Sequence, residues 1–172
     1  MVTEERKGIM VIKEKMQKAI NEQINAELYS SYLYLSMAAY FEANNWLGFA
    51  AWMKIQAKEE NMHAMKFYDY VFARGGRVTL DAIDAPKTEW KTPLAVFEEV
   101  YTHELKVTTL INSLVDLAKK ENDHATESVL KWFIDEQVEE ESNSALIVEK
   151  LKRIKDSTNG LFMLDHKLGE RK

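Results

Sequence analysis

Helix-breaking residues are scarce in this chain, which limits the folds that it can adopt. Only two prolines and six glycines occur among 172 residues, and these two residue types are the least compatible with a helix interior. Apolar residues recur three and four residues apart, which is the period of an amphipathic helix. The sequence therefore predicts four long helices, at about residues 12–43, 46–74, 92–121 and 123–155.

The connections between these segments predict their topology. Asn44-Asn45 and Asn122-Asp123 are short turns, so each adjacent pair of helices forms an antiparallel hairpin. Gly75-Gly76 stops the second segment, and Thr92-Pro93 is a capping residue followed by proline at the first helical position. The long link at 77–91 can run the length of the bundle, so the third helix can lie parallel to the second.

A break at residues 157–160 precedes a short amphipathic piece at 161–168. The predicted fold is all-α: a four-helix bundle with one long crossover and a short fifth helix at the C-terminus. Residues 1–9 read as a polar N-terminal tail, and residues 10–172 as one domain.

Composition excludes several functional classes. The chain has no cysteine, so thiolate metal sites and cysteine nucleophiles are excluded. A net charge of −5 argues against a nucleic-acid partner. No apolar run reaches the roughly 20 residues of a membrane helix, and the N-terminus lacks an apolar signal core. We therefore expect a cytoplasmic protein with no membrane partner.

A glutamate interrupts each of the four apolar stripes, well inside its helix: Glu27, Glu60, Glu104 and Glu140. Alternating helix directions allow these carboxylates to meet in one layer of the bundle. Burying several uncompensated charges is costly, so the carboxyls must hold protons or bind cations. One such glutamate alone is more often a surface position, but four at comparable depth favour a metal site. Two divalent cations would balance their charge.

Residues beside these glutamates extend the predicted site. Glu60 and His63 are spaced i, i+3 and share one helical face, and a Glu-x-x-His pair among glutamates of other helices is typical of di-iron carboxylate proteins. The fourth helix has Gln137 three residues before Glu140, where many di-iron enzymes repeat the Glu-x-x-His pair. We therefore expect one iron to be bound more loosely than the other.

Four other residues can each be interpreted in two ways. Tyr34 follows Glu27 by two helical turns, and can donate an electron or a hydrogen bond near the metals or serve as a core aromatic. The acidic residues Glu59, Glu136 and Glu139 flank the presumed ligands. They can form a further iron site or a solvated helix face.

Four segments carry a family resemblance, from about Lys15 to Leu168: NEQINAELYSSYLYLSMA, FAAWMKIQAKEENMHAMKFYDYVFARGG, VYTHELKVT and LKWFIDEQVEEE. They resemble the bacterial and archaeal non-haem ferritins. The resemblance implies a ferritin-like domain, a homo-oligomeric hollow shell that usually has 24 subunits, and oxidation of iron(II) by dioxygen or hydrogen peroxide. The product would be a stored ferric oxyhydroxide mineral.

The resemblance also implies ligand assignments. The first iron position would use Glu27, Glu60 and His63. The second would use Glu60 as a bridge, with Glu104, Glu140 and nearby Gln137. Tyr34 matches a tyrosine beside the centre, and the third iron position of the bacterial type would use Glu59, Glu136, Glu139 and Glu140.

Two departures bear on the cofactor and on the alternative function. Haem-binding relatives carry a methionine directly after the second-helix glutamate, and Asn61 stands there instead, so no haem is expected. The alternative function is another di-iron carboxylate enzyme on the same bundle, such as an oxygenase or peroxidase. That alternative predicts a second Glu-x-x-His pair, which Gln137 and Glu140 do not supply.

Overall fold

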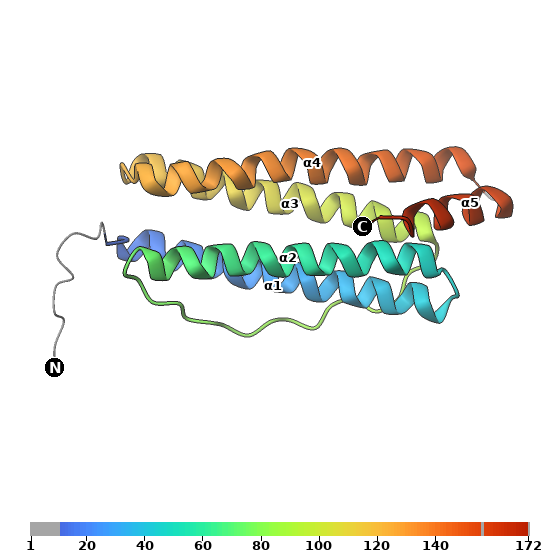
Figure 1. Cartoon of the computed structure of the whole chain (residues 1–172), viewed down its shortest axis with the longest axis horizontal. Helices are drawn as coiled ribbons and strands as arrows, with labels where there is room; N and C mark the ends of the chain where they lie inside the picture. Colours follow the sequence, from blue (N-terminus) through green and yellow to red (C-terminus); the bar gives the residue numbers. More distant parts are fainter. Residues whose placement is uncertain (1–10, 156, 172) are drawn as a thin grey trace.

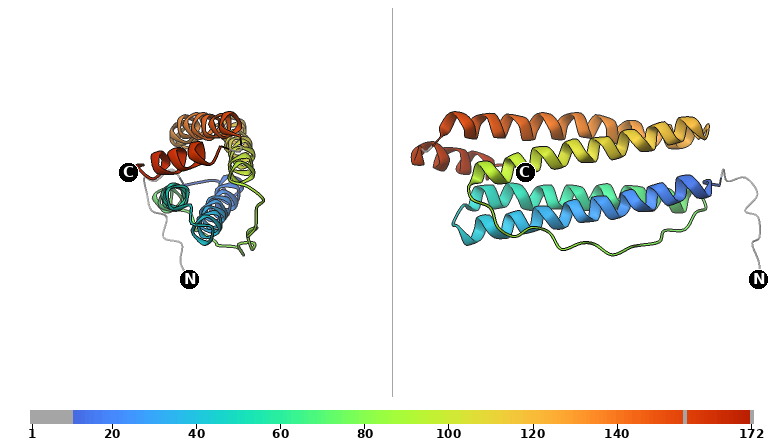
Figure 2. Two further views of the ribbon diagram at one scale, coloured as in Figure 1. Left: turned by 90° about the vertical axis from the view of Figure 1, so that its right-hand side faces the viewer. Right: turned by 180° about the vertical axis from the view of Figure 1, so that it is seen from behind.

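The computed structural model describes residues 11–155 and 157–171 and contains five helices in that part of the chain. Helix α1 (Glu14–Ala43) pairs with α2 (Leu47–Ala73), and α3 (Pro93–Lys120) pairs with α4 (His124–Ile154). Both pairs are antiparallel hairpins, and α3 runs parallel to α2 (Figure 1). The end-on view in Figure 2 shows the two hairpins packed face to face as a four-helix bundle. The predicted fold class is confirmed; the predicted tail at 1–9 lies outside the described residues.

The turns and caps follow the sequence closely. Asn45 adopts a φ of 61° and Gly75 a φ of 68°, the left-handed conformation that reverses the chain after a helix. Asp123 accepts a hydrogen bond from the Thr126 N–H at 3.1 Å and caps α4. Thr92 likewise caps α3 with its side chain. These local signals set where each long helix begins and ends.

One predicted boundary is wrong. The break expected at residues 157–160 is shorter, because α5 begins at Thr158 and runs to Leu168. The Ser157 side chain accepts a hydrogen bond from the Gly160 N–H at 3.2 Å. Because of this cap, Gly160 lies inside the first turn of α5 and does not mark the end of α4.

The crossover between α2 and α3 runs alongside α1 (Figure 1). It has no helix or strand of its own, so its backbone groups need partners from elsewhere. Polar side chains of α1 supply them. Asn21 donates to the Arg77 carbonyl at 3.2 Å, Asn25 to the Ala82 carbonyl at 2.9 Å, and Ser36 to the Lys87 carbonyl at 2.6 Å.

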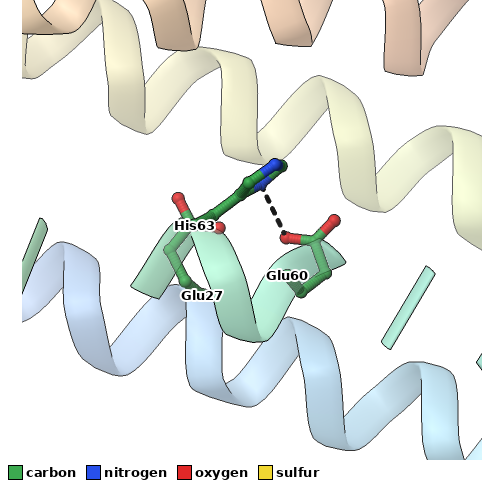
Figure 3. A group of neighbouring side chains, drawn as sticks. All are labelled: Glu27, Glu60 and His63. Carbon is green, nitrogen blue, oxygen red and sulfur yellow. Dashed lines mark ion pairs between the residues drawn. The ribbon is translucent and has the colours of Figure 1, made fainter. Parts of the chain in front are cut away.

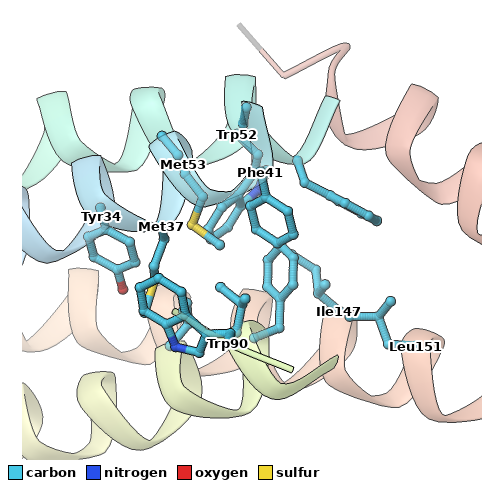
Figure 4. Close-up of a cluster of buried hydrophobic side chains, with 14 of the residues drawn as sticks. Tyr34, Met37, Phe41, Trp52, Met53, Trp90, Ile147 and Leu151 are labelled. Atoms are coloured by element: carbon cyan, nitrogen blue, oxygen red, sulfur yellow. The ribbon is translucent and has the colours of Figure 1, made fainter. Parts of the chain in front are cut away.

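The apolar core forms two clusters, one toward each end of the bundle. One contains Phe41, Phe49 and Trp52 together with residues of α3 and α4 (Figure 4). The other contains Ile24, Phe67 and further residues of all four long helices. The layer between the clusters holds the buried polar residues of the predicted site. None of the described helices combines the length and the apolar character that a membrane-spanning segment requires.

Candidate metal centre

The centre of the bundle brings together Glu27 of α1 and the Glu60-x-x-His63 pair of α2 (Figure 3). One ligand atom from each of the three residues lies within 4.8 Å of the others. The His63 Nδ1 atom is 3.6 Å from Glu60 Oε2. All three side chains are buried. Two carboxylates and an imidazole at this separation are suited to iron or manganese.

Glu104 of α3 forms the opposite side of the layer. It accepts a short hydrogen bond from the Tyr34 hydroxyl, and its Oε2 accepts another from Gln137 Nε2 at 3.2 Å. Gln137 also donates to the Glu104 backbone carbonyl at 3.3 Å. Tyr34 and Gln137 therefore fix the orientation of the Glu104 carboxylate from α1 and α4.

Glu140 is buried on α4, while the three additional acids lie nearer the surface. Glu136 Oε2 is 3.8 Å from His63 Nε2, and the side chain of Glu136 is 32% exposed. Glu59 is 30% exposed and accepts a hydrogen bond from Arg171. Glu139 is exposed. Thus Glu59 and Glu136 lie at the rim of the buried layer, and Glu139 lies outside it.

Burial raises the pKa of all four central carboxyls. The pKa of Glu27 lies well above its usual value because of burial and the nearby charge of Glu60. Burial and the charge of Glu104 raise the pKa of Glu60 well above its usual value. Burial also raises the pKa of Glu104. For Glu140, burial and the charge of Glu104 raise the pKa to about 7. Without metal, these carboxyl groups tend to keep their protons. A bound cation would favour the ionised form, and the protons would be released.

One buried oxygen indicates that the layer suits a metal ion. Glu27 Oε2 is buried and has no hydrogen-bond partner in the described structure. An unsatisfied buried carboxylate oxygen is costly, and it belongs to one of the three residues that group around a common point. A cation at that point would satisfy this oxygen and offset the mutual repulsion of the carboxylates.

Sequence reasoning did not single out three residues that contact the site. Gln23 donates to Glu27 Oε1 at 2.8 Å, and Gln56 donates to Glu60 Oε1 at 3.3 Å. Both glutamines precede their glutamates by four residues, so i, i+4 spacing could have revealed them. Arg171, near the C-terminus, contacts Gln56 and Glu59. No short-range spacing in the sequence predicts that contact.

A four-helix bundle with one long crossover that buries glutamates and one Glu-x-x-His pair at its centre has the architecture of the ferritin-like carboxylate proteins. The comparisons with known proteins then identify the family. The ferritin-like domain family matches residues 17–154. The chain belongs to the ferritin family.

Named relatives cover nearly the whole chain. A bacterial non-heme ferritin of Bacteroides fragilis is 51% identical over 94% of this chain and 100% of its own length. Another from Staphylococcus saprophyticus is 42% identical over 94% of this chain and 96% of its own length. The crystal structure of an open pore ferritin from the hyperthermophilic archaeon Archaeoglobus fulgidus superposes with a TM-score of 0.93. It is 52% identical, over 94% of this chain and 99% of that one. The predicted resemblance is confirmed.

Proposed function

We propose that this protein stores iron: it oxidises iron(II) at the centre inside each subunit and holds the ferric oxyhydroxide product within a hollow homo-oligomeric shell. The observation that carries the proposal is the grouping of Glu27, Glu60 and His63 in a buried layer between two apolar clusters. The relatives named as ferritins support both the storage role and the shell. Iron is the substrate and the stored cargo.

The first iron position is formed by the three grouped residues. Glu27 and Glu60 supply carboxylate oxygens, and His63 supplies a ring nitrogen. Gln23 donates to Glu27 Oε1, which leaves the partnerless Oε2 as the oxygen available to a cation. The apolar clusters on either side exclude water, which strengthens the attraction between the carboxylates and a cation.

The second position uses Glu60 as a bridge together with Glu104 and Glu140. Gln137 orients Glu104 but offers only a weak amide oxygen in place of a second imidazole. Its Nε2 atom is already engaged with Glu104. This position therefore has no imidazole ligand, unlike the first, and we expect its iron to be held more loosely. Loose binding suits an ion that must be passed on after oxidation by dioxygen or hydrogen peroxide.

Tyr34 and the outer acidic residues also take part in the function of the centre. The Tyr34 hydroxyl donates to Glu104. Through this contact the tyrosine can adjust the hydrogen bonding of a ligand of the second position, or supply an electron there. Glu59, Glu136, Glu139 and Glu140 form a third, outer iron position on the route to the shell interior. Two of these acids are half-buried at the rim and one is exposed, as a transit position requires.

The alternative, a different di-iron enzyme on this bundle, gains no support from the geometry. The α4 position that would carry a second Glu-x-x-His pair holds Gln137 and Glu140. Gln137 is committed to hydrogen bonds with Glu104. Iron storage explains this asymmetry better than substrate oxygenation does.

The test adds iron(II) in air to the purified protein and measures the ferric content and size of the soluble particles. We expect a soluble ferric core far larger than the subunit sites alone can hold. Glu60→Gln keeps the side-chain shape but removes the bridging charge, so it should slow oxidation strongly. Asp69→Ala, which removes an exposed acid from the same helix, should oxidise iron at the wild-type rate. Absence of a soluble core would eliminate storage, and an unaffected Glu60→Gln variant would eliminate the assigned centre.

A further inference from the structure

The C-terminal segment folds back against α2 and reaches the metal centre. Helix α5 packs on the beginning of α2, and the end of the described chain lies beside α2 in both side views (Figures 1 and 2). Asp165 of α5 accepts a hydrogen bond from the Phe49 N–H at 2.8 Å. Because the N-cap residue of α2, Trp46, makes no side-chain capping bond, Asp165 serves as the cap of α2 from another helix.

Gly48 allows this close approach. A Cβ atom at Gly48 would lie 1.8 Å from the Asp165 carbonyl oxygen, so any larger residue would push α5 away. The glycine and the aspartate thus fix the position of α5 on α2. This anchor sets where the next residues after α5 can reach.

Arg171 extends from this anchor along one face of α2. Its guanidinium lies over the Trp52 ring, 4.8 Å from the centroid. Its Nη1 atom donates to Gln56 Oε1 at 2.8 Å, and its Nη2 atom donates to the Glu59 carboxylate. Residues 52, 56 and 59 are spaced by four and three, so they lie along the same helical face. The guanidinium therefore has a stacked and doubly hydrogen-bonded position.

The Arg171 contacts orient Gln56 toward the site. Arginine has no acceptor, so the Gln56 amide oxygen must face the guanidinium and its NH2 group must face inward. That NH2 group donates to Glu60 Oε1 at 3.3 Å. Arg171 is thus a cation placed against both Glu59 and Gln56.

We propose that Arg171 is a tethered cation that occupies the outer, Glu59 side of the centre when iron is absent, and that an incoming iron ion must displace it. This inference rests on the proposed function and adds a regulating residue to it. The guanidinium and an iron ion are both attracted to the Glu59 carboxylate, and they compete because two cations on one carboxylate repel each other. Displacement also frees the Gln56 oxygen to rotate, which ties occupancy of the outer position to the hydrogen bond on Glu60.

The test measures iron(II) binding under conditions in which the iron is not oxidised. Wild-type and variant proteins are titrated with iron(II) under anaerobic conditions, and affinities are read by calorimetry. A hydrogen bond to a charged group is worth roughly tenfold or more in an equilibrium constant. We therefore expect Arg171→Ala to tighten the outer position by about tenfold and to change the affinities of the two inner positions by much less. Arg171→Lys keeps the charge but not the two-pronged geometry, and should fall between wild type and Arg171→Ala.

Lys167→Ala is the matched control. Lys167 lies in the same segment and carries the same charge, but it pairs with Glu170 at 2.8 Å and is 73% exposed. This variant should bind iron(II) like the wild type. Equal or weaker outer binding in Arg171→Ala, with both inner positions intact, would overturn the inference and leave the proposed function standing. Absence of tight iron(II) binding in every protein would refute the proposed function, and the inference with it.

Discussion

Replacing Glu140 with glutamine in the metal-free protein should increase its stability at neutral and alkaline pH. The pKa of Glu140 is raised from 4.5 to about 7 by burial and by the charge of Glu104. This rise in the pKa of Glu140 corresponds to about 3 kcal/mol, at about 1.36 kcal/mol for each tenfold change in the ionisation constant. Glutamine keeps the shape of the side chain and stays neutral at every pH. It therefore removes the cost of ionising this buried carboxyl.

The pH window follows from the direction of the shift. Between about pH 4.5 and about pH 7, the folded protein keeps a proton on Glu140 that the unfolded chain has released. Because the folded state binds more protons, the free energy of unfolding falls as pH rises through this window. The cost is absent below about pH 4.5 and complete above about pH 7. Glu140→Gln should match the wild type at the acidic end and exceed it by about 3 kcal/mol at the alkaline end.

Thermal unfolding in the presence of a chelator provides the measurement. About 3 kcal/mol corresponds to roughly 6–12 °C in Tm for a chain of this size. All proteins must be compared at one concentration, since assembly also shifts Tm. Glu149→Gln is the control, because Glu149 is an exposed acid that pairs with the solvated Lys152 at 3.6 Å. An equal loss of Tm with rising pH in Glu140→Gln and wild type would show that ionisation of Glu140 does not destabilise the folded protein.

Two further substitutions test the surroundings of the site. Tyr34→Phe removes a donor from buried Glu104 and should cost about 1–3 kcal/mol in the metal-free protein; denaturant unfolding measures this, and an unchanged midpoint would show that the hydroxyl does not support the carboxyl. Asp123→Ala breaks the buried pair in which Arg74 Nη1 and Nη2 lie 3.0 and 3.2 Å from the carboxylate oxygens. It also removes the α4 cap, so the unfolding free energy should fall by about 3–5 kcal/mol; a loss below about 1 kcal/mol would contradict this role of the pair.

The sequence alone determined the helices and the residues that they direct inward. A helical face is encoded by spacing, so each apolar stripe shows which residues meet the other helices. The glutamates that interrupt the stripes at Glu27, Glu60, Glu104 and Glu140 are buried in the structure. The turn at Asn45 and the cap at Asp123 are equally local signals, because they act within a few residues of the chain.

Which carboxyls lie close together, and which side chains orient them, depends on how the helices pack. Glu27, Glu60 and His63 group closely, whereas Glu104 is oriented by Tyr34 and Gln137. Each of these arrangements depends on how the helices are rotated and shifted against one another, which helical spacing does not specify.

The contact of Arg171 with Glu59 is the clearest case of an arrangement that helical spacing does not specify, because the two residues are 112 positions apart in the sequence. The position of Arg171 depends on Asp165 capping α2 and on Gly48 admitting the backbone of α5. None of these residues has a periodic pattern that links it to the metal centre. Periodicity records which face of a helix is buried, but a contact between a chain end and a distant helix exists only after the helices have packed.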